Sequence, residues 1–417
     1  MHSSSISHQR LDYLDAVRAF ALLLGIVFHA SLSFMPVFIG WAVMDISTSS
    51  VVSTFMLLSH SFRMPLFFVI AGYFSRMNWH KDAAGHFIRS RLLRLGLPFT
   101  LGWFILRPLL VIGWMLGAIS MQGEADLSVA FTMWQNSPGE LPNGLFIGTH
   151  LWFLYYLALA TAIVLLVRYL MSLNTALNQT IHHWADRLTD SLSKAKLAPL
   201  WLACVSAPIV WFMQNFGLDT PDKSLWPLLP VLLIYTGCFA LGWLLQRQAT
   251  ALTDLTRLSV ARWLLGLLAC IATLLIADRV FQADDPNHTL IKALAVFCYA
   301  LTLWSLVILT IGLFRRFLSK PNKVIRYLAD ASYWLYLIHL PIVVFLQVAV
   351  AELELHWLLK LSAISAITIG VSLLLYDLLV RPTLIGKILN GKRKPSALWR
   401  LLGPAQAISV SSTGRSG

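Results

Sequence analysis

Ionisable side chains lie inside segments that are otherwise apolar, and Arg18 and His29 are the pair with the most informative spacing. Eleven residues make about three helical turns, so both side chains project from nearly the same helix face, about 16 Å apart along the axis. Titratable groups in apolar segments are costly and usually face a cavity or a partner. Because neutral histidine serves as a general base or as a nucleophile, this pair favours a catalytic role for His29.

A second histidine and arginine, His60 and Arg63, lie in the next apolar segment. If consecutive segments run in opposite directions, counting residues places His60 at the depth of His29. Two histidines and an arginine would then converge, and they would need water or an anion between them. The structural alternative is that His60 bonds to a neighbouring helix and that Arg63 pairs with a carbonyl or with His60.

Two later histidines also lie in or beside apolar segments. His339 precedes Pro341, which would loosen the helix at that point, so we expect a functional or supporting role for this histidine. His150 opens a segment at its outer interface, two residues before Trp152. At such an interface a structural histidine is as compatible with the sequence as a functional one.

The basic pair Arg91 and Arg94 precedes the third apolar segment. Their spacing of three residues places both on one helix face, and forked guanidinium groups suit phosphate oxygens. We expect the pair at the N-terminal end of this helix, where the helix dipole also favours anions. Taken alone, the pair would indicate an ordinary cytoplasmic anchor.

The elements that position these residues are predicted by composition. The chain has 417 residues, of which 58% are hydrophobic and only 12% charged, and its mean hydropathy is +0.71. Soluble domains carry about a quarter charged residues, so the composition excludes a water-soluble enzyme, a disordered protein and a nucleic-acid binder. No C-x-x-C spacing links the four cysteines, so we expect neither a metal site nor a disulfide framework. The partner that the composition predicts is the lipid bilayer.

A membrane-spanning helix needs about 20 mostly apolar residues. The sequence therefore predicts an all-α, polytopic integral membrane protein with one transmembrane domain over residues 1–390 and a basic, disordered cytoplasmic tail over 391–417. About ten segments qualify as spans, at 14–38, 51–75, 95–118, 149–171, 198–216, 225–246, 260–281, 290–314, 332–351 and 357–380.

The distribution of basic residues predicts the topology. Of the 32 Lys and Arg residues, 25 fall on the side that holds both termini and four fall on the other side, so both termini are expected in the cytoplasm. Acidic residues of the outer connections, among them Asp45 and Asp219, are typical of solvated loops. The connection 172–197, which contains His182 and His183, is also typical of a solvated loop.

Several of these motifs resemble one protein family. Arg-x10-His (Arg18, His29), Arg-x-x-Arg (Arg91, Arg94) and the stretch 67–74 resemble the acyltransferase-3 family of integral-membrane acyltransferases, which modify envelope glycans. Within that family the chain is most similar to the branch that succinylates osmoregulated periplasmic glucans. The similar segments are 14–19, 60–64, 150–154, 336–341 and 375–377, whereas 172–330 matches only in hydropathy. Two departures are Asp377, where a glutamate is usual in this branch, and Arg107, which has no counterpart.

The resemblance implies a membrane acyltransferase of the bacterial inner membrane that moves a succinyl group from cytoplasmic succinyl-CoA to hydroxyls of periplasmic glucan. It implies no permanently bound cofactor, because acyl-CoA is a substrate. His29 would be the catalytic residue. We expect catalytic support from Arg18, Asp15, His60, Arg63, His339 and Tyr336, donor binding by Arg91, Arg94 and Arg18, and an acceptor side near His150 and Trp152.

Three alternatives stay open on sequence alone. The protein could be an O-acetyltransferase that acts on another envelope polysaccharide, because nothing in the sequence distinguishes succinyl-CoA from acetyl-CoA. It could instead be a secondary transporter or glycolipid exporter, although such proteins commonly show internal repeats and intramembrane acidic residues, which are not apparent here. A non-catalytic scaffold would not require His29 and Arg18 in apolar surroundings. The oligomeric state also stays open, and a homo-oligomer is compatible with the sequence.

Overall fold

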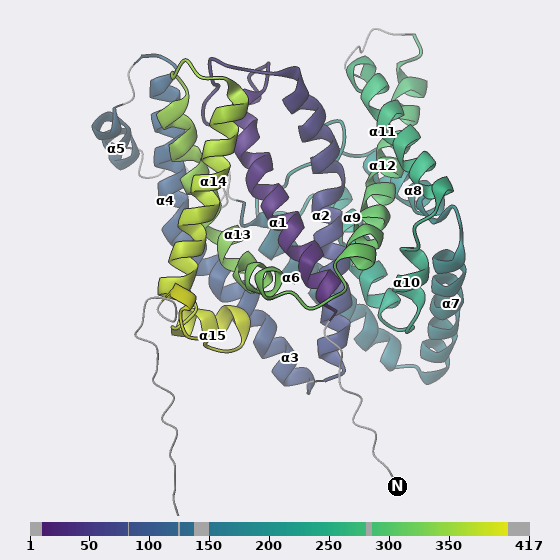
Figure 1. Cartoon of the computed structure of the whole chain (residues 1–417). Helices are drawn as coiled ribbons and strands as arrows, with labels where there is room; N and C mark the ends of the chain where they lie inside the picture. The colour runs from purple at the N-terminus through teal and green to yellow at the C-terminus, as the bar shows by residue number, and fades with distance from the viewer. Residues whose placement is uncertain (1–10, 82, 124–125, 137–149, 281–285, 399–417) are drawn as a thin grey trace, which may run out of the picture.

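The structure is a computed structural model, and it describes residues 11–81, 83–123, 126–136, 150–280 and 286–398. All regular secondary structure in these ranges is helical, which confirms the predicted all-α class (Figure 1). The helices are α1 (Asp12–Ser31), α2 (Ser50–Trp79), α3 (Ala84–Arg91), α4 (Leu97–Ser120), α5 (Leu127–Asn136), α6 (Trp152–Ser172), α7 (Thr175–Lys194), α8 (Ala198–Val210), α9 (Leu229–Leu245), α10 (Ala251–Leu255), α11 (Val260–Val280), α12 (His288–Phe317), α13 (Lys323–Val350), α14 (Trp357–Leu375) and α15 (Leu384–Asn390).

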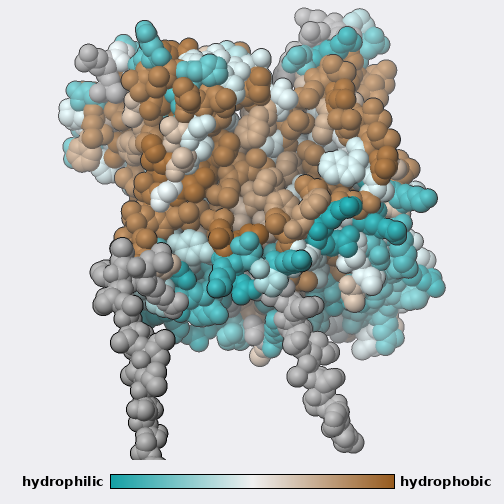
Figure 2. Space-filling model, viewed as in Figure 1, coloured by the Kyte–Doolittle hydropathy of each residue, from teal (hydrophilic) through white to brown (hydrophobic). Residues whose placement is uncertain are grey.

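Within the described ranges, eight helical stretches are long and apolar enough to cross a membrane. They cover eight of the ten predicted segments, and the shorter apolar helices α8 and α9 occupy the other two, 198–216 and 225–246. Figure 2 shows a broad hydrophobic surface over the middle and upper parts of the molecule, with a hydrophilic zone below it. The protein is therefore a multi-pass membrane protein, whereas the number of crossings stays a prediction.

The start of α1 and helix α15 lie at the same, lower end of the bundle in Figure 1. We call it the basic end, because Arg18, Arg91 and Arg94 are near it. This arrangement agrees with a topology in which both ends of the chain are on one side. Assignment of that side to the cytoplasm rests on the charge distribution alone.

Helix α1 lies in the centre of the bundle, where it packs against α2, α12, α13 and α14. Close packing of α2 on α9 depends on two glycines. A Cβ atom at Gly72 would lie 1.9 Å from the carbonyl oxygen of Phe239, and one at Gly242 would lie 1.9 Å from that of Val69. Small residues let membrane helices approach closely, so these two positions hold α2 in place against its neighbour.

The C-terminal region differs from the predicted disordered tail. Residues 391–398 lie against the body of the protein, because the carboxylate of Asp377 accepts hydrogen bonds from the Ser396 hydroxyl and from the backbone N–H of Ala397 and Leu398, the latter two at 2.9 and 3.0 Å. Lys394 also pairs with Asp330. The remainder of the predicted tail, 399–417, lies outside the described residues.

Three residues that the sequence placed in solvated loops have specific partners instead. Asp45 is 3% exposed and its carboxylate lies 2.8 Å from the ammonium of Lys360, which is equally buried. Asp219 is also buried and accepts hydrogen bonds from the backbone N–H groups that follow α8. His182 belongs to helix α7, which occupies most of the predicted loop, and contacts Arg247 at 3.1 Å. These interactions join segments far apart in the sequence, so local patterns did not reveal them.

Candidate active site

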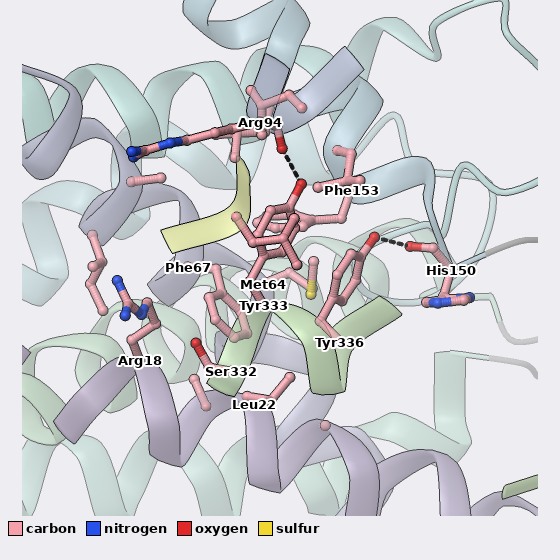
Figure 3. A pocket seen from close by; sticks show the side chains of 18 of the residues that line it. Arg18, Leu22, Met64, Phe67, Arg94, His150, Phe153, Ser332, Tyr333 and Tyr336 are labelled. Atoms are coloured by element: carbon pink, nitrogen blue, oxygen red, sulfur yellow. Dashed lines mark hydrogen bonds between the residues drawn. The ribbon is translucent and has the colours of Figure 1, made fainter. Parts of the chain in front are cut away.

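A cavity of about 360 Å³ lies between α1, α2, α6 and α13, with α15 and the stretch joining α3 to α4 at its basic end. Figure 3 shows side chains from these separate helices around one space. The cavity brings together most of the residues that the sequence singled out. Its lining includes Arg18, His29, Arg63, Arg91, Arg94, His150, Trp152, Tyr336 and His339.

The basic end of the cavity carries three arginines. Arg18 donates to the carbonyl oxygen of Ala329 at 2.5 Å and lies 3.7 Å from Asp15. The guanidinium of Arg91 lies 5.0 Å from the centre of the Phe87 ring. Because three cations line this end, it is suited to bind an anion with several oxygen atoms, such as a phosphate group.

One part of the sequence argument for Arg91 and Arg94 is wrong. Helical structure begins at Ala84 and continues through the π-helical turn Leu92–Gly96 into α4, so the pair lies inside a helical stretch and not at its N-terminus. The helix dipole therefore does not favour an anion there. Both arginines still line the cavity, as their spacing of three residues on one helix face predicted.

Prolines help to place two side chains that line the cavity. Pro98 cannot donate the usual i→i−4 hydrogen bond to the carbonyl of Arg94, and the hydroxyl of Tyr333 donates to that oxygen (Figure 3). Pro341 likewise leaves the carbonyl of Leu337 available, and His150 Nε2 donates to it at 2.9 Å. Helix α13 therefore continues through Pro341 without a break, and the freed carbonyl anchors a histidine.

The opposite end of the cavity, the histidine end, is built around His29 and His339. His29 Nδ1 lies 3.2 Å from His339 Nε2. His339 Nδ1 lies 2.8 and 3.1 Å from the carbonyl oxygens of Tyr336 and Leu335. Carbonyl oxygens only accept, so Nδ1 of neutral His339 donates and its Nε2 accepts. His29 Nδ1 must then donate to His339, which leaves Nε2 of His29 as the unprotonated nitrogen.

His150 and Tyr336 connect α6 to α13 beside this pair. The hydroxyl of Tyr336 donates to the backbone carbonyl of His150 at 2.7 Å (Figure 3). The ring centres of His150 and His339 are 5.3 Å apart, edge to face. Together with the bond from His150 to Leu337, these contacts hold the α13 segment that carries His339 against the start of α6.

Arg63 provides a cation near His29. It is 6% exposed, and its guanidinium lies 4.3 Å from the centre of the Phe28 ring. Gly25, one helical turn before His29, leaves room for it, since a Cβ there would be 2.9 Å from Arg63 Nη1. The guanidinium therefore lines the cavity about one turn from the catalytic candidate.

Two predicted supporting residues do not line the cavity. His60 contacts the carbonyl oxygen of Leu218 at 2.8 Å and stacks on the ring of Phe28. Because Phe28 is the neighbour of His29 on α1, His60 lies near the depth that residue counting predicted, but its side chain bonds to the stretch between α8 and α9, which fits the structural role considered for it. Asp15 is buried and lies 3.7 Å from Arg18, which does line the cavity.

Sequence reasoning missed two residues at the histidine end. Trp41 follows α1, and its ring lies 5.9 Å from that of His29. Its indole N–H donates to Gln347 at 2.9 Å, and the amide of Gln347 donates to the carbonyl oxygens of His29 and Ala30. The sequence signal that could have revealed them was the amide of Gln347 inside an apolar segment, because a buried amide is energetically costly without a hydrogen-bond partner.

Arg107, which the resemblance left unexplained, lies outside this cavity. Its guanidinium lies 5.1 Å from the centre of the Trp103 ring on the same helix. Within the described residues, no group of three or more His, Cys, Asp or Glu side chains has the arrangement to hold a metal ion.

Comparisons with known proteins identify the family of the chain. The family described as Acyltransferase domain, the acyltransferase-3 family, matches residues 11–377. The chain is 26% identical to glucans biosynthesis protein C of Escherichia coli strain K12, over 92% of this chain and 95% of the relative. It is also 26% identical to the protein of that name from Salmonella typhi, over 93% of this chain and 97% of the relative. No solved structure matches the chain significantly. Residues 11–377 span nearly all of the described helices and every residue that lines the cavity except Leu389 and Asn390, so the chain belongs to the acyltransferase-3 family and is an acyltransferase.

Proposed function

We propose that the protein transfers a succinyl group from cytoplasmic succinyl-CoA to hydroxyl groups of a periplasmic glucan, in the inner membrane of a bacterium. One observation carries this proposal: a single cavity joins an arginine-rich end to a histidine whose Nε2 is unprotonated. The name of the relatives supports glucan as the acceptor class.

The donor binds with its phosphates at the basic end. Arg18, Arg91 and Arg94 supply guanidinium groups to these oxygens. Arg18 and His29 are eleven residues apart on α1, about 16 Å along the helix, so the pantetheine arm extends along α1 towards the histidine end. The apolar lining between the two ends, including Leu22 and Phe67, excludes water from the thioester.

His29 acts on the acceptor hydroxyl as a general base. Its Nε2 takes the hydroxyl proton while the alkoxide oxygen forms a bond to the thioester carbonyl carbon. Arg63 stabilises the negative charge on the carbonyl oxygen. The carbon–sulfur bond then breaks, and the thiolate of CoA takes the proton from His29, so the products are an ester and free CoA.

A covalent route uses the same residues. Nε2 of His29 attacks the thioester carbon, the carbon–sulfur bond breaks, and CoA leaves as the thiolate, so that His29 becomes an acyl-imidazolium with its Nδ1 proton retained. The glucan hydroxyl then attacks the acyl carbon, gives its proton to water or to the thiolate, and Nε2 of His29 is released. The two routes differ in the absence of acceptor, because only the covalent route gives a burst of CoA equal to the amount of enzyme together with acyl label on His29.

The acceptor approaches from the histidine end. Trp41 and Gln347 lie beside His29 at this end, since the indole ring of Trp41 lies 5.9 Å from the ring of His29 and 5.0 Å from that of Trp114 and its N–H is hydrogen-bonded to Gln347. A sugar ring that reaches His29 from this side contacts the indole of Trp41, and an aromatic face buries the apolar face of a sugar.

The test uses the purified full chain in nanodiscs, with succinyl-CoA or acetyl-CoA and a β-glucan acceptor. Free CoA and acylated glucan are followed by mass spectrometry, with His29→Ala in parallel. Succinylated glucan that is absent with His29→Ala supports the proposal. Acetylated product without succinylated product would assign the protein to O-acetyl transfer, the alternative considered above. Thioester turnover that His29→Ala leaves intact would refute the assigned role of His29.

A further inference from the structure

A second group of arginines lies at the basic end, away from the cavity. Arg76 is near the end of α2, Arg168 near the end of α6, and Arg247 just after α9. None of the three lines the cavity, and the face of α2 that carries Arg76 packs against α9, where the guanidinium lies 5.9 Å from the centre of the Trp243 ring. This group, which we call the Arg76 cluster, plays no part in the proposed acyl transfer.

Among the residues that the structure describes, one carboxylate, Asp186, lies beside the Arg76 cluster, and Arg247 pairs with it. Arg247 donates to both oxygens of Asp186, at 2.6 and 2.7 Å, and contacts His182 Nδ1 at 3.1 Å. The hydrogen bond from Arg247 lowers the pKa of Asp186, so this carboxylate is ionised. The charge of Arg247 is therefore balanced by a direct ion pair, whereas Arg76 and Arg168 form no ion pair with a carboxylate of the described residues.

Arg76 is the unusual member of the cluster. It is only 9% exposed, and its Nε and Nη1 atoms are buried and have no hydrogen-bond partner among the described residues. Arg168 and Arg247 lie close enough to repel it, which adds to the unfavourable environment of its charge. A buried cation without a counterion is strongly unfavourable, and arginine at such a position is expected to bind an anion.

The surroundings indicate where this anion comes from. Helix α7 carries His182 and Asp186 on one face, and on the other face it exposes Leu177, Ile181, Trp184 and Leu188, which follow helical spacing. Figure 1 shows α7 at the outer edge of the bundle. A helix with one polar face and one outward apolar face is typical of a helix that lies in the lipid interface.

We propose that the Arg76 cluster is a binding site for a phosphate group, and that an anionic phospholipid supplies this group from the bilayer beside α7. Basic pockets between membrane helices on the cytoplasmic side suit such head groups. Arg76 and Arg168 donate to the phosphate oxygens, and Asp186 keeps Arg247 in place beside them. The nucleotide end of CoA also carries phosphate groups, and it is the second candidate ligand that the experiment distinguishes.

The test uses the full chain in nanodiscs of phosphatidylcholine alone or of phosphatidylcholine with phosphatidylglycerol. Native mass spectrometry counts the phosphatidylglycerol that stays bound after release from the nanodisc. Arg76→Gln with Arg168→Gln should lower retention about tenfold or more, since each lost charge-assisted hydrogen bond weakens binding by about that factor. The control, Arg187→Gln with Arg316→Gln, removes the same charge from more exposed positions and should retain the lipid.

A second arm measures binding of CoA and dephospho-CoA to the same variants in phosphatidylcholine nanodiscs. Loss of CoA binding without loss of phosphatidylglycerol would identify the nucleotide phosphate as the source. Equal retention of both ligands by the Arg76/Arg168 variant and the control would overturn the proposal. Arg168→Gln alone, at a half-buried position, provides a variant that folds if the double variant does not, and it should show a smaller loss in the same direction.

This inference is independent of the proposed acyl transfer. Lipid retention is measured without any thioester, so absence of succinyl transfer would not affect the result. Conversely, a variant that loses the bound lipid can still be assayed for acyl transfer, because Arg76 and Arg168 do not line the cavity that contains His29.

Discussion

The two ends of the cavity contain similar numbers of titratable side chains but hold them differently. At the basic end, Arg18 donates to a backbone carbonyl and pairs with Asp15, Arg91 lies over an aromatic ring, and both side chains line the cavity. At the histidine end, backbone carbonyls determine which nitrogen of His339 carries the proton, and His339 determines the same for His29. The difference indicates that one end is built to bind charge and the other to move a proton.

The largest effect is expected at His29. His29→Ala should lower acyl transfer by about 100- to 10,000-fold, the usual contribution of a general base, and more if the histidine is acylated. The measurement is the rate of CoA release with saturating donor and acceptor. His60→Asn is the comparison, because His60 contacts Leu218 and does not line the cavity. A loss of similar size in both variants would contradict the distinction between these histidines.

His339 should matter through its hydrogen bond to His29. His339→Ala removes the acceptor for His29 Nδ1, and we expect transfer to fall by about 100-fold, as for other groups that orient a functional histidine. His339→Gln retains an accepting oxygen and should recover part of this loss. If the glutamine variant is no more active than the alanine variant, His339 serves only in packing.

Arg63 could serve the chemical step or the binding of the donor, and kinetics with two different acyl-CoA donors distinguish these roles. If Arg63 stabilises the carbonyl oxyanion, Arg63→Gln should lower kcat by about 10- to 100-fold for succinyl-CoA and acetyl-CoA alike. If it instead binds the free carboxylate of succinate, the loss should be confined to succinyl-CoA and should appear mainly in KM. Steady-state kinetics with both donors decides between these roles, and unchanged kinetics with either donor would exclude both.

The smallest effect on the chemical step is expected at the basic end. Arg91→Gln and Arg94→Gln should each raise KM for the donor about tenfold, since each removes a charge-assisted hydrogen bond to phosphate, with little change in kcat. Arg89→Gln is the matched control, because Arg89 is exposed on the same helix and does not line the cavity. A large fall in kcat with unchanged KM would contradict the division of the cavity into a binding end and a chemical end.

The sequence predicted the relative positions of site residues more accurately when both residues lie on the same helix than when they lie on different helices. Arg18 and His29 line one cavity because the helical period alone places them on one face of α1. For His60, residue counting predicted the depth, beside Phe28, but not whether the side chain lines the cavity, because depth along a span says nothing about the rotation of the helix around its axis. The dipole argument for Arg91 and Arg94 was wrong because amphipathic residues before the apolar segment extend the helix back to Ala84.

Other features depend on pairs of residues that no local pattern connects. Asp377 binds the segment 396–398, and Asp45 is buried with Lys360, although each carboxylate looked like an ordinary polar residue near the end of a span or in a loop. Each pair exists because burial leaves a charge no alternative to a specific partner. Which partner it finds is decided by how the helices pack.

Composition and hydropathy were enough to predict the all-helical membrane architecture, most of the apolar helices and the residue types of the site. A bilayer requires long apolar helices, and every ionisable group within them is therefore conspicuous. The protonation pattern of His29, in contrast, could be inferred only from the packed helices. This pattern depends on His339, 310 residues further along the chain, and on the carbonyl oxygens of Leu335 and Tyr336 in α13 that accept the proton of His339 Nδ1. Hydrogen bonds of this kind are directional and short, so they form only when packing brings distant segments together within a few ångströms.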